Sequence, residues 1–245
     1  MEQFLLKHKK MDFTDLKPLD LKKIKVVDFP SDQYFHEYHN KTQVVLHHTV
    51  SGPEARGDIT TWIRDKRRIA TCIIVDGYGV PHQLFSSRFW AGHTGVSSKL
   101  DRHSIGVEID CWGGLIKGDG EIHQFGKNSD GSPRMVRTKV GKFYAAYGNV
   151  VDVAIQYYPD GFRGYKYYQK YNEKQLRTVG ELLLFWRDRY EIPLTYNSDM
   201  WDVSQRARSG EPGVWTHVSL RPYPQKFDCH PQPELIQMLK TIQNL

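Results

Sequence analysis

The sequence predicts an α/β fold, on the evidence of two buried-strand patterns and one long helical pattern. Residues 43–48 and 104–110 are rich in Val, Ile and Leu without polar alternation, which is typical of strands covered by helices on both faces of a sheet. Residues 172–190 repeat apolar side chains at helical spacing. A chain of 245 residues can bury one large core, and a single domain is the simpler interpretation.

The chain begins with an expected N-terminal arm, residues 1–41, which is polar and has no sustained period; residues 42–245 are expected to form the domain. Asp58 can cap a short helix that carries Ile59, Trp62 and Ile63. The next expected unit is a hairpin, in which residues 72–75 turn through Asp-Gly-Tyr-Gly at 76–79 into residues 80–84.

A long insertion is expected at about residues 112–171, where the hydrophobic periodicity is lost and Gly, Asp, Lys and Tyr are frequent. Its tyrosines could stack against sugar rings, or their rings could pack a large irregular loop onto the domain; the second interpretation is the more economical. The tyrosines concerned are Tyr144, Tyr147, Tyr157, Tyr158, Tyr165, Tyr167, Tyr168 and Tyr171.

Two helices are expected after the insertion. Asn172 begins a core helix, because Gln175 is placed for a capping box and five apolar residues follow at spacings of three and four: Leu176, Val179, Leu183, Trp186 and Tyr190. Residues 233–245 are expected to form a short terminal helix with three residues facing inward: Leu235, Ile236 and Leu239.

Composition argues against several classes of protein. The formal charge is +6, but basic residues are mixed with 28 acidic ones, so no arm for nucleic acid is expected and a polyanionic surface is the more suitable partner. The three cysteines form no C-x-x-C pair, which argues against a disulfide framework and for a reducing compartment. Since no signal-peptide pattern and no run of about 18 apolar residues is present, we expect a soluble protein made in the cytoplasm.

Residues that can bind a metal gather in two distant segments. His47 and His48 end the first strand pattern, and the last quarter of the chain holds a second group: His217, Lys226, Asp228, Cys229 and His230. A catalytic zinc ion uses three protein ligands and keeps its fourth position for water. His47, His217 and one of Asp228, Cys229 or His230 could supply that set, and no H-E-x-x-H helix offers an alternative.

Four strings carry a resemblance to a known family. VVLHHTVS at 44–51, FWAGHTG at 89–95, HSIGVEID at 103–110 and WTHVSLRPYPQKFDCHP at 215–231 resemble, in this order, signature segments of the zinc N-acetylmuramoyl-L-alanine amidases. The resemblance spans about residues 42–240. It implies a single amidase catalytic domain with a central mixed β-sheet flanked by helices. It also implies hydrolysis of the amide between N-acetylmuramic acid and L-alanine in peptidoglycan.

The same resemblance implies roles for individual residues. His47 and His217 match two zinc ligands, and Asp228 matches the third because Lys226-Phe227-Asp228 fits the family's Lys-x-ligand spacing; Cys229 is the alternative. Glu108 matches the glutamate that takes a proton from the zinc-activated water, and Lys226 would stabilise the oxyanion. Three residues match the substrate side of the site: His48, Trp90 and His93. Without the resemblance, a structural carboxylate paired with an arginine such as Arg102 would be the preferred interpretation of Glu108.

Three functions therefore compete. The first is a zinc amidase acting on peptidoglycan, either a phage endolysin or a bacterial cell-wall enzyme. The second is a non-catalytic peptidoglycan-binding module of the recognition-protein type. The third is a sugar- or polyanion-binding protein whose tyrosine-rich insertion is the functional surface. The sequence indicates no nucleic-acid partner and no membrane-spanning segment, and it gives no oligomeric state.

Overall fold

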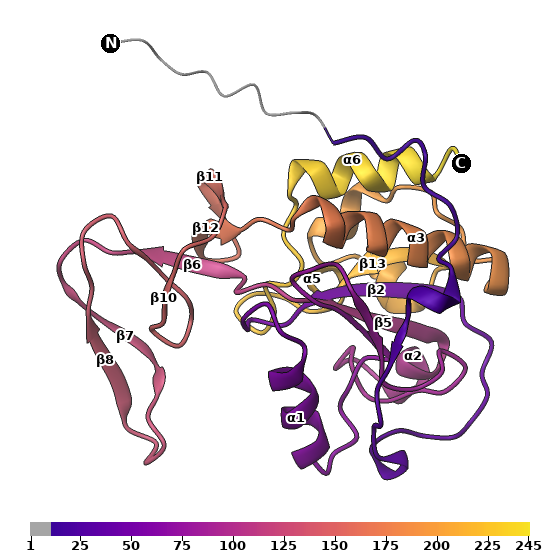
Figure 1. Ribbon diagram of the computed structural model, residues 1–245, viewed down its shortest axis with the longest axis horizontal. Helices are drawn as coiled ribbons and strands as arrows, with labels where there is room; N and C mark the ends of the chain where they lie inside the picture. The colour runs from indigo at the N-terminus through magenta and orange to yellow at the C-terminus, as the bar shows by residue number, and fades with distance from the viewer. Residues whose placement is uncertain (1–10) are drawn as a thin grey trace.

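A computed structural model describes residues 11–245 (Figure 1). Its centre is a mixed sheet with the strand order β1-β4-β3-β5-β2-β13, in which β3 and β4 are antiparallel and the other neighbours are parallel. The strands are β1 (Lys25–Val26), β2 (Gln43–His48), β3 (Ile73–Val75), β4 (Pro81–Gln83), β5 (Ser104–Ile109) and β13 (Gly213–Thr216). The expected strands at 43–48 and 104–110 and the expected hairpin are confirmed.

Helices cover both faces of this sheet, as Figure 1 shows, with α3 and α6 on one side and α1 and α2 on the other. This arrangement explains why β2 is apolar along its whole length, with Val44, Val45 and Leu46 fully buried. The helices are α1 (Arg56–Arg64), α2 (Ser98–His103), α3 (Glu173–Tyr190), α4 (Gln205–Ser209), α5 (His217–Leu220) and α6 (Pro233–Ile242). Short 3₁₀ turns lie at Leu21–Lys23, Ser31–Gln33 and Ser198–Trp201. The expected α/β class, with a central mixed sheet, is confirmed.

The longest helix begins as expected and two shorter ones differ in detail. In α3 the Asn172 side chain accepts from the Gln175 backbone, and the Gln175 side chain accepts from the Asn172 backbone, which confirms the capping box. Helix α1 begins earlier than expected, so Asp58 lies inside its first turn and accepts a hydrogen bond from Ser51 Oγ at 2.7 Å. In α6 the residues buried beside Leu235 and Leu239 are Met238 and Ile242, whereas Ile236 is half-exposed.

The described part of the N-terminal arm packs on the domain. Phe13, Leu16 and Leu19 are buried in the main core, and β1 extends the sheet by pairing in parallel with β4. Residues 1–10 of the expected arm lie outside the described residues.

The insertion has regular β-structure, so the expectation of an irregular segment is wrong. One sheet has the order β10-β9-β6-β12-β11, and β7 pairs with β8 separately. The strands are β6 (Gly114–Lys117), β7 (Ile122–Lys127), β8 (Pro133–Arg137), β9 (Phe143–Tyr144), β10 (Val150–Val151), β11 (Ile155–Phe162) and β12 (Tyr165–Gln169). Tyr144, Tyr168 and Tyr171 are buried, which favours the packing interpretation for them, whereas Tyr147 and Tyr157 are exposed.

Candidate metal centre and cleft

The parallel strands bring three of the expected site residues to one edge of the sheet. His47 lies near the end of β2, and Glu108 is its register partner near the end of β5. His217 directly follows β13, which pairs with β2 in parallel. Parallel strands share a carboxyl edge, so the topology places these side chains together.

The loop after α5 adds a carboxylate. A backbone hydrogen bond from Val218 N to Asp228 O, 2.9 Å long, folds this loop back beside His217. His47 Nδ1 and His217 Nδ1 are 2.8 Å apart, and Asp228 Oδ2 lies 3.3 Å from the first and 3.0 Å from the second. These three buried donors could hold a metal ion. The described residues thus bring together the imidazoles of His47 and His217 with Asp228, without Cys229 or His230.

Electrostatics favour the protonation states that metal ligands need. Burial, reinforced by the neighbouring His217, lowers the pKa of His47 to about 3, against the opposing effect of Asp228. Burial alone would raise the pKa of Asp228, but His217 and His47 outweigh it and hold this pKa well below its usual range. The cluster therefore presents a neutral His47 imidazole and an ionised carboxylate, the forms that coordinate metal.

Glu108 and Lys226 border the same cleft. Burial, with Asp228 nearby, raises the pKa of Glu108 well above its usual range, and the Lys226 charge opposes that rise. Its Oε2 is buried and has no hydrogen-bond partner among the residues described. The alternative pairing is not found, because Arg102 lies instead near Glu37, at 3.8 Å, and over the Trp90 ring.

His48 belongs to a second cluster, which contains no carboxylate. His48 Nδ1 lies 2.9 Å from the Tyr171 hydroxyl, and the two nitrogens of His230 contact the Tyr158 hydroxyl at 2.8 Å and the Gln169 carbonyl at 3.0 Å. Burial lowers the pKa of His48 to about 4. Gly113 allows the insertion to approach this ring, since a Cβ there would lie 2.6 Å from His48 Nε2. His48 still borders the cleft, and its Nε2 has no hydrogen-bond partner in the described part of the chain.

The FWAGHTG segment is divided between two places. Trp90 is buried, stacks on Phe35 at 4.0 Å between ring centroids and donates to Glu37, away from the cleft lining. His93 lines the cleft and contacts His47 Nε2 at 3.1 Å.

Sequence reasoning missed three residues that support the cluster: Thr94, Asp101 and Ser104. His217 Nε2 donates to the Thr94 carbonyl at 3.2 Å, and Ser104 Oγ lies 2.8 Å from His93 Nε2. Asp101 Oδ1 accepts from both backbone amides, His93 N and Thr94 N, and so fixes this loop. A serine at the start of a strand and a backbone carbonyl carry no distinctive sequence signal.

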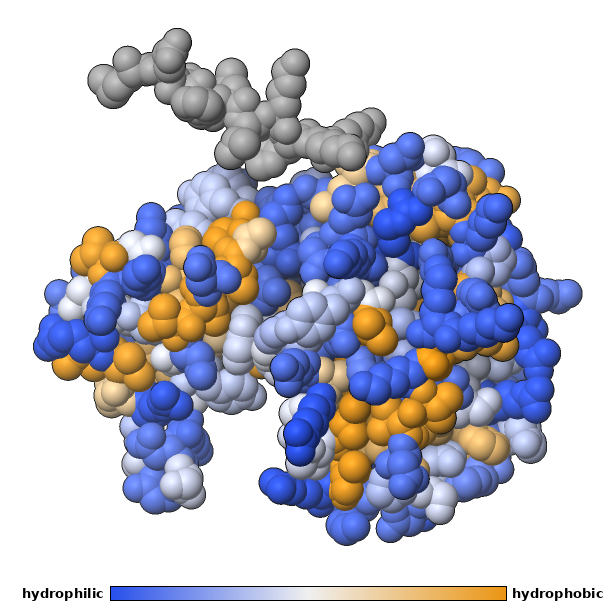
Figure 2. Space-filling model, in the orientation of Figure 1, coloured by the Kyte–Doolittle hydropathy of each residue, from blue (hydrophilic) through white to orange (hydrophobic). Residues whose placement is uncertain are grey.

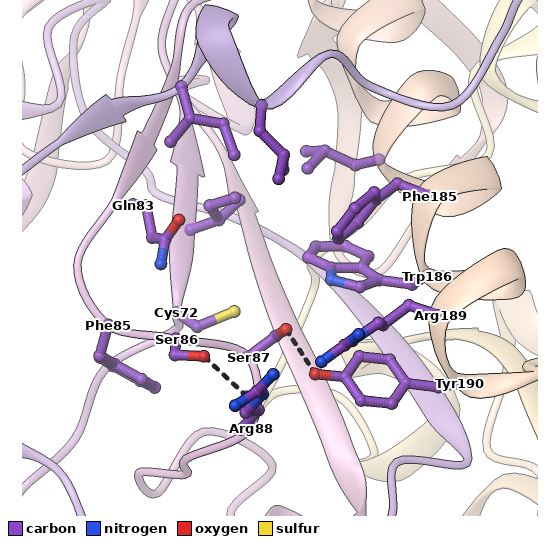
Figure 3. A pocket seen from close by; sticks show the side chains of 14 residues that line it. Cys72, Gln83, Phe85, Ser86, Ser87, Arg88, Phe185, Trp186, Arg189 and Tyr190 are labelled. Atoms are coloured by element: carbon purple, nitrogen blue, oxygen red, sulfur yellow. Dashed lines mark hydrogen bonds between the residues drawn. The ribbon is translucent and has the colours of Figure 1, made fainter.

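The cleft beside the cluster has a volume of about 240 Å³. Figure 2 shows the molecular surface hollowed between the insertion and the body of the domain. A separate cavity of about 410 Å³ lies between β3, β4 and α3, where Cys72 and Gln83 face Phe185 and Trp186 (Figure 3). None of the three donor residues lines that cavity, so we assign the chemistry to the smaller cleft.

The sequence model of one protein family, described as N-acetylmuramoyl-L-alanine amidase, matches residues 37–229. The chain belongs to this family. The match covers both distant segments of the cluster, from the strand of His47 to the loop of Asp228. The protein is accordingly an N-acetylmuramoyl-L-alanine amidase that acts on peptidoglycan, as the four strings suggest.

Solved structures similar to this amidase have low sequence identity to it. The Staphylococcus aureus hydrolase AmiA in complex with its ligand is 13% identical, with a TM-score of 0.48, and the match covers 93% of this chain and 85% of that one. For PlyL the identity is 15%, the TM-score 0.46 and the coverage 88% and 94%. The selenomethionine derivative of AmpD is 14% identical, with a TM-score of 0.46 and coverage of 94% and 98%. The family assignment rests on the family match alone.

A search of curated protein sequences finds no match to this amidase. Among residues 11–245, no helix is both long and apolar enough to cross a membrane. The three cysteines are all buried and unpaired, in agreement with the expectation of no disulfide framework.

Proposed function

We propose that this amidase is a zinc enzyme whose ligands are His47, His217 and Asp228. The observation that carries the proposal is the convergence of three buried donor atoms, with mutual separations of 2.8, 3.0 and 3.3 Å. A tetrahedral zinc site, with bonds of about 2.0 to 2.1 Å, separates its ligand atoms by about 3.3 Å, so the donor set fits the ion. Two imidazoles and one carboxylate are also ligands that zinc accepts in catalytic sites.

Asp228 is our choice for the third ligand over Cys229. The Cys229 side chain is fully buried beside Tyr171, and its thiol has a pKa raised well above its usual range, chiefly by burial. A neutral thiol is a poor ligand, because zinc binds the thiolate. The Asp228 carboxylate, by contrast, already faces both imidazoles.

Zinc in such a site supplies a water whose pKa is lowered from about 15.7 to near 7, together with a Lewis acid for the lactyl carbonyl. Glu108 accepts the proton of the attacking water and returns it to the departing alanine nitrogen. The environment of Glu108 suits this exchange, because burial shifts its pKa upward, in the direction of neutral pH. A general acid–base group is most efficient when its pKa lies near the working pH.

The remaining roles concern charge and substrate position. Lys226 is half-buried at the cleft, where its ammonium group stabilises the oxyanion that develops on the lactyl oxygen. His48 and His93 border the cleft and would contact substrate. Trp90 acts on substrate only indirectly in this proposal, since it does not line the cleft and contacts Phe35 and Glu37 instead.

The proposed setting is the bacterial cell wall, where the enzyme serves either as a phage endolysin or as a bacterial cell-wall amidase. A peptidoglycan-binding module without catalysis is the other function that the sequence alone leaves open. A complete set of donors, with Glu108 and Lys226 beside it, favours the enzyme.

The test is digestion of purified sacculi, followed by mass spectrometry of the released material. We expect new free amino termini on L-alanine, loss of their release after chelation, and its return with zinc. Binding to sacculi without new termini would establish the non-catalytic alternative instead.

A further inference from the structure

A chain of hydrogen bonds leads from the candidate metal centre into the core. Ser104 Oγ lies 2.7 Å from the Leu100 carbonyl and 2.8 Å from His93 Nε2, while His93 Nδ1 lies 3.1 Å from His47 Nε2. Ser104 is buried, at 3% exposure, and His93 is half-buried. Strand β5 makes room for the His93 ring at Gly106, where a Cβ would come within 3.0 Å of it.

The chemistry of each group fixes the direction of this chain. A carbonyl oxygen only accepts, so the single Ser104 hydroxyl hydrogen goes to Leu100, and the hydroxyl must accept from His93 Nε2–H. A neutral His93 then has an unprotonated Nδ1, which accepts from His47 Nε2–H. The remaining His47 nitrogen, Nδ1, is left as a bare lone pair directed at His217 and Asp228.

We propose that His93, held by Ser104, is a positioning residue that fixes His47 in the tautomer required of a metal ligand. The tautomer of His217 is fixed in a similar way by a single hydrogen bond, because its Nε2–H donates to the Thr94 carbonyl and leaves Nδ1 free. His93 and Thr94, which fix the two tautomers, lie next to each other in one loop. Asp101 holds this loop by accepting hydrogen bonds from the backbone amides of both residues. Partners of this kind orient the ring and raise its basicity, so their loss weakens metal binding about 10- to 100-fold.

The inference rests on the proposed ligand set but has a readout of its own. In the metal-free protein, long-range ¹H–¹⁵N correlation of the His47 ring reports which nitrogen carries the proton. We expect the Nε2–H tautomer in the wild type and a mixture with the Nδ1–H tautomer in His93→Ala. Zinc affinity, measured by competition with a chelating dye, should fall about 10- to 100-fold in the same variant.

A conservative variant separates this role from simple packing. The Asn Oδ1 of His93→Asn can stand where His93 Nδ1 stands and accept from His47, so this smaller side chain should restore most of the affinity that His93→Ala loses. Ser104→Ala removes only the far end of the chain and should give an intermediate loss. His123→Ala is the matched control, since His123 lies on β7 and bonds Asp119.

The outcomes separate the two proposals. Unchanged His47 tautomer and unchanged zinc affinity in His93→Ala would overturn the positioning role. Full zinc affinity in His47→Ala would overturn the ligand set, and the tautomer measurement on metal-free protein would still decide whether His93 directs His47.

Discussion

The two neighbouring histidines of β2 belong to two different clusters. Because successive side chains of a strand point to opposite faces, the His47 ring meets His217 and Asp228 whereas the His48 ring meets Tyr171. Both rings are buried and both have lowered pKa values. They differ in their partners: the first cluster contains an ionised carboxylate, and the second offers hydroxyl groups and a backbone carbonyl.

This difference shows why burial of a histidine does not by itself indicate a metal site. In the second cluster each ring nitrogen of His230 already has a hydrogen-bond partner, so no set of lone pairs converges. In the first, two imidazole nitrogens and a carboxylate oxygen face one another. Acceptors this close repel unless a proton or a metal ion lies between them.

The strongest way to break the comparison is to remove one ring from each cluster. His47→Ala or His217→Ala should lose stoichiometric zinc and all measurable amide hydrolysis, because two remaining ligands hold the ion poorly. His230→Ala should keep zinc while losing about 2 to 5 kcal/mol of unfolding free energy, since it leaves a cavity in the core. Metal analysis and denaturant unfolding measure both effects. Full zinc content in either His47→Ala or His217→Ala would contradict the comparison.

A second pair of substitutions tests whether Asp228 or the adjacent Cys229 belongs to the metal-binding cluster. Asp228→Ala should abolish zinc retention, whereas Cys229→Ser should largely preserve it, because this thiol is protonated and faces Tyr171. Zinc content after dialysis is the measurement. The opposite pattern would move the third ligand to Cys229.

Glu108 tests whether the first cluster is catalytic as well as metal-binding. Glu108→Ala and Glu108→Gln should keep zinc but lower kcat and kcat/KM together by about 10² to 10⁴, the usual contribution of general acid–base catalysis. The exposed Glu121→Ala is the matched control. Near wild-type turnover in Glu108→Gln at equal zinc occupancy would show that another residue moves the proton.

Lys226 should have a somewhat smaller effect. Lys226→Ala should retain zinc and lose about 10² to 10³ in kcat, as expected when one oxyanion-stabilising group is removed. Lys127→Ala, a surface substitution on β7, controls for the general loss of a positive charge. A rise in KM with unchanged kcat would instead assign Lys226 to substrate binding.

The pH dependence is the smallest expected effect. Glu108 must be ionised to accept a proton, and burial raises its pKa above 4.5, so kcat/KM should fall as the pH drops through a value above 4.5. The Lys226 charge lowers this pKa, so in Lys226→Ala the acid limb should move to higher pH. A limb that moves to lower pH would show that the titrating group is not Glu108.

Local patterns predicted the scaffold of the site well. The strands of His47 and Glu108 follow from apolar runs, and α3 follows from its capping box, because burial and capping leave short-range signals. The strands of the insertion do not, since their polar and aromatic residues lack a clear alternation: the burial of β11 is mixed along its length.

The residues that support the candidate metal centre could not be predicted in the same way. His217 and Thr94 are 123 positions apart, and the acceptor is a backbone carbonyl that any residue could provide. Ser104 acts through its position at the start of β5, where its hydroxyl contacts His93 Nε2. This position depends on how α2 and the sheet pack. The roles of the candidate metal ligands and of Glu108 and Lys226 were predicted from the resemblance to the amidase family. The supporting roles of Thr94 and Ser104 become visible only in the three-dimensional structure.

The most direct test of the account is the location of the metal in a crystal of the zinc-loaded amidase, by anomalous diffraction at the zinc edge. We predict one peak, about 2.0 to 2.2 Å from His47 Nδ1, His217 Nδ1 and an Asp228 carboxylate oxygen. A peak bound by His48 or His230, or by the Cys229 sulfur, would contradict the assignment of the two clusters.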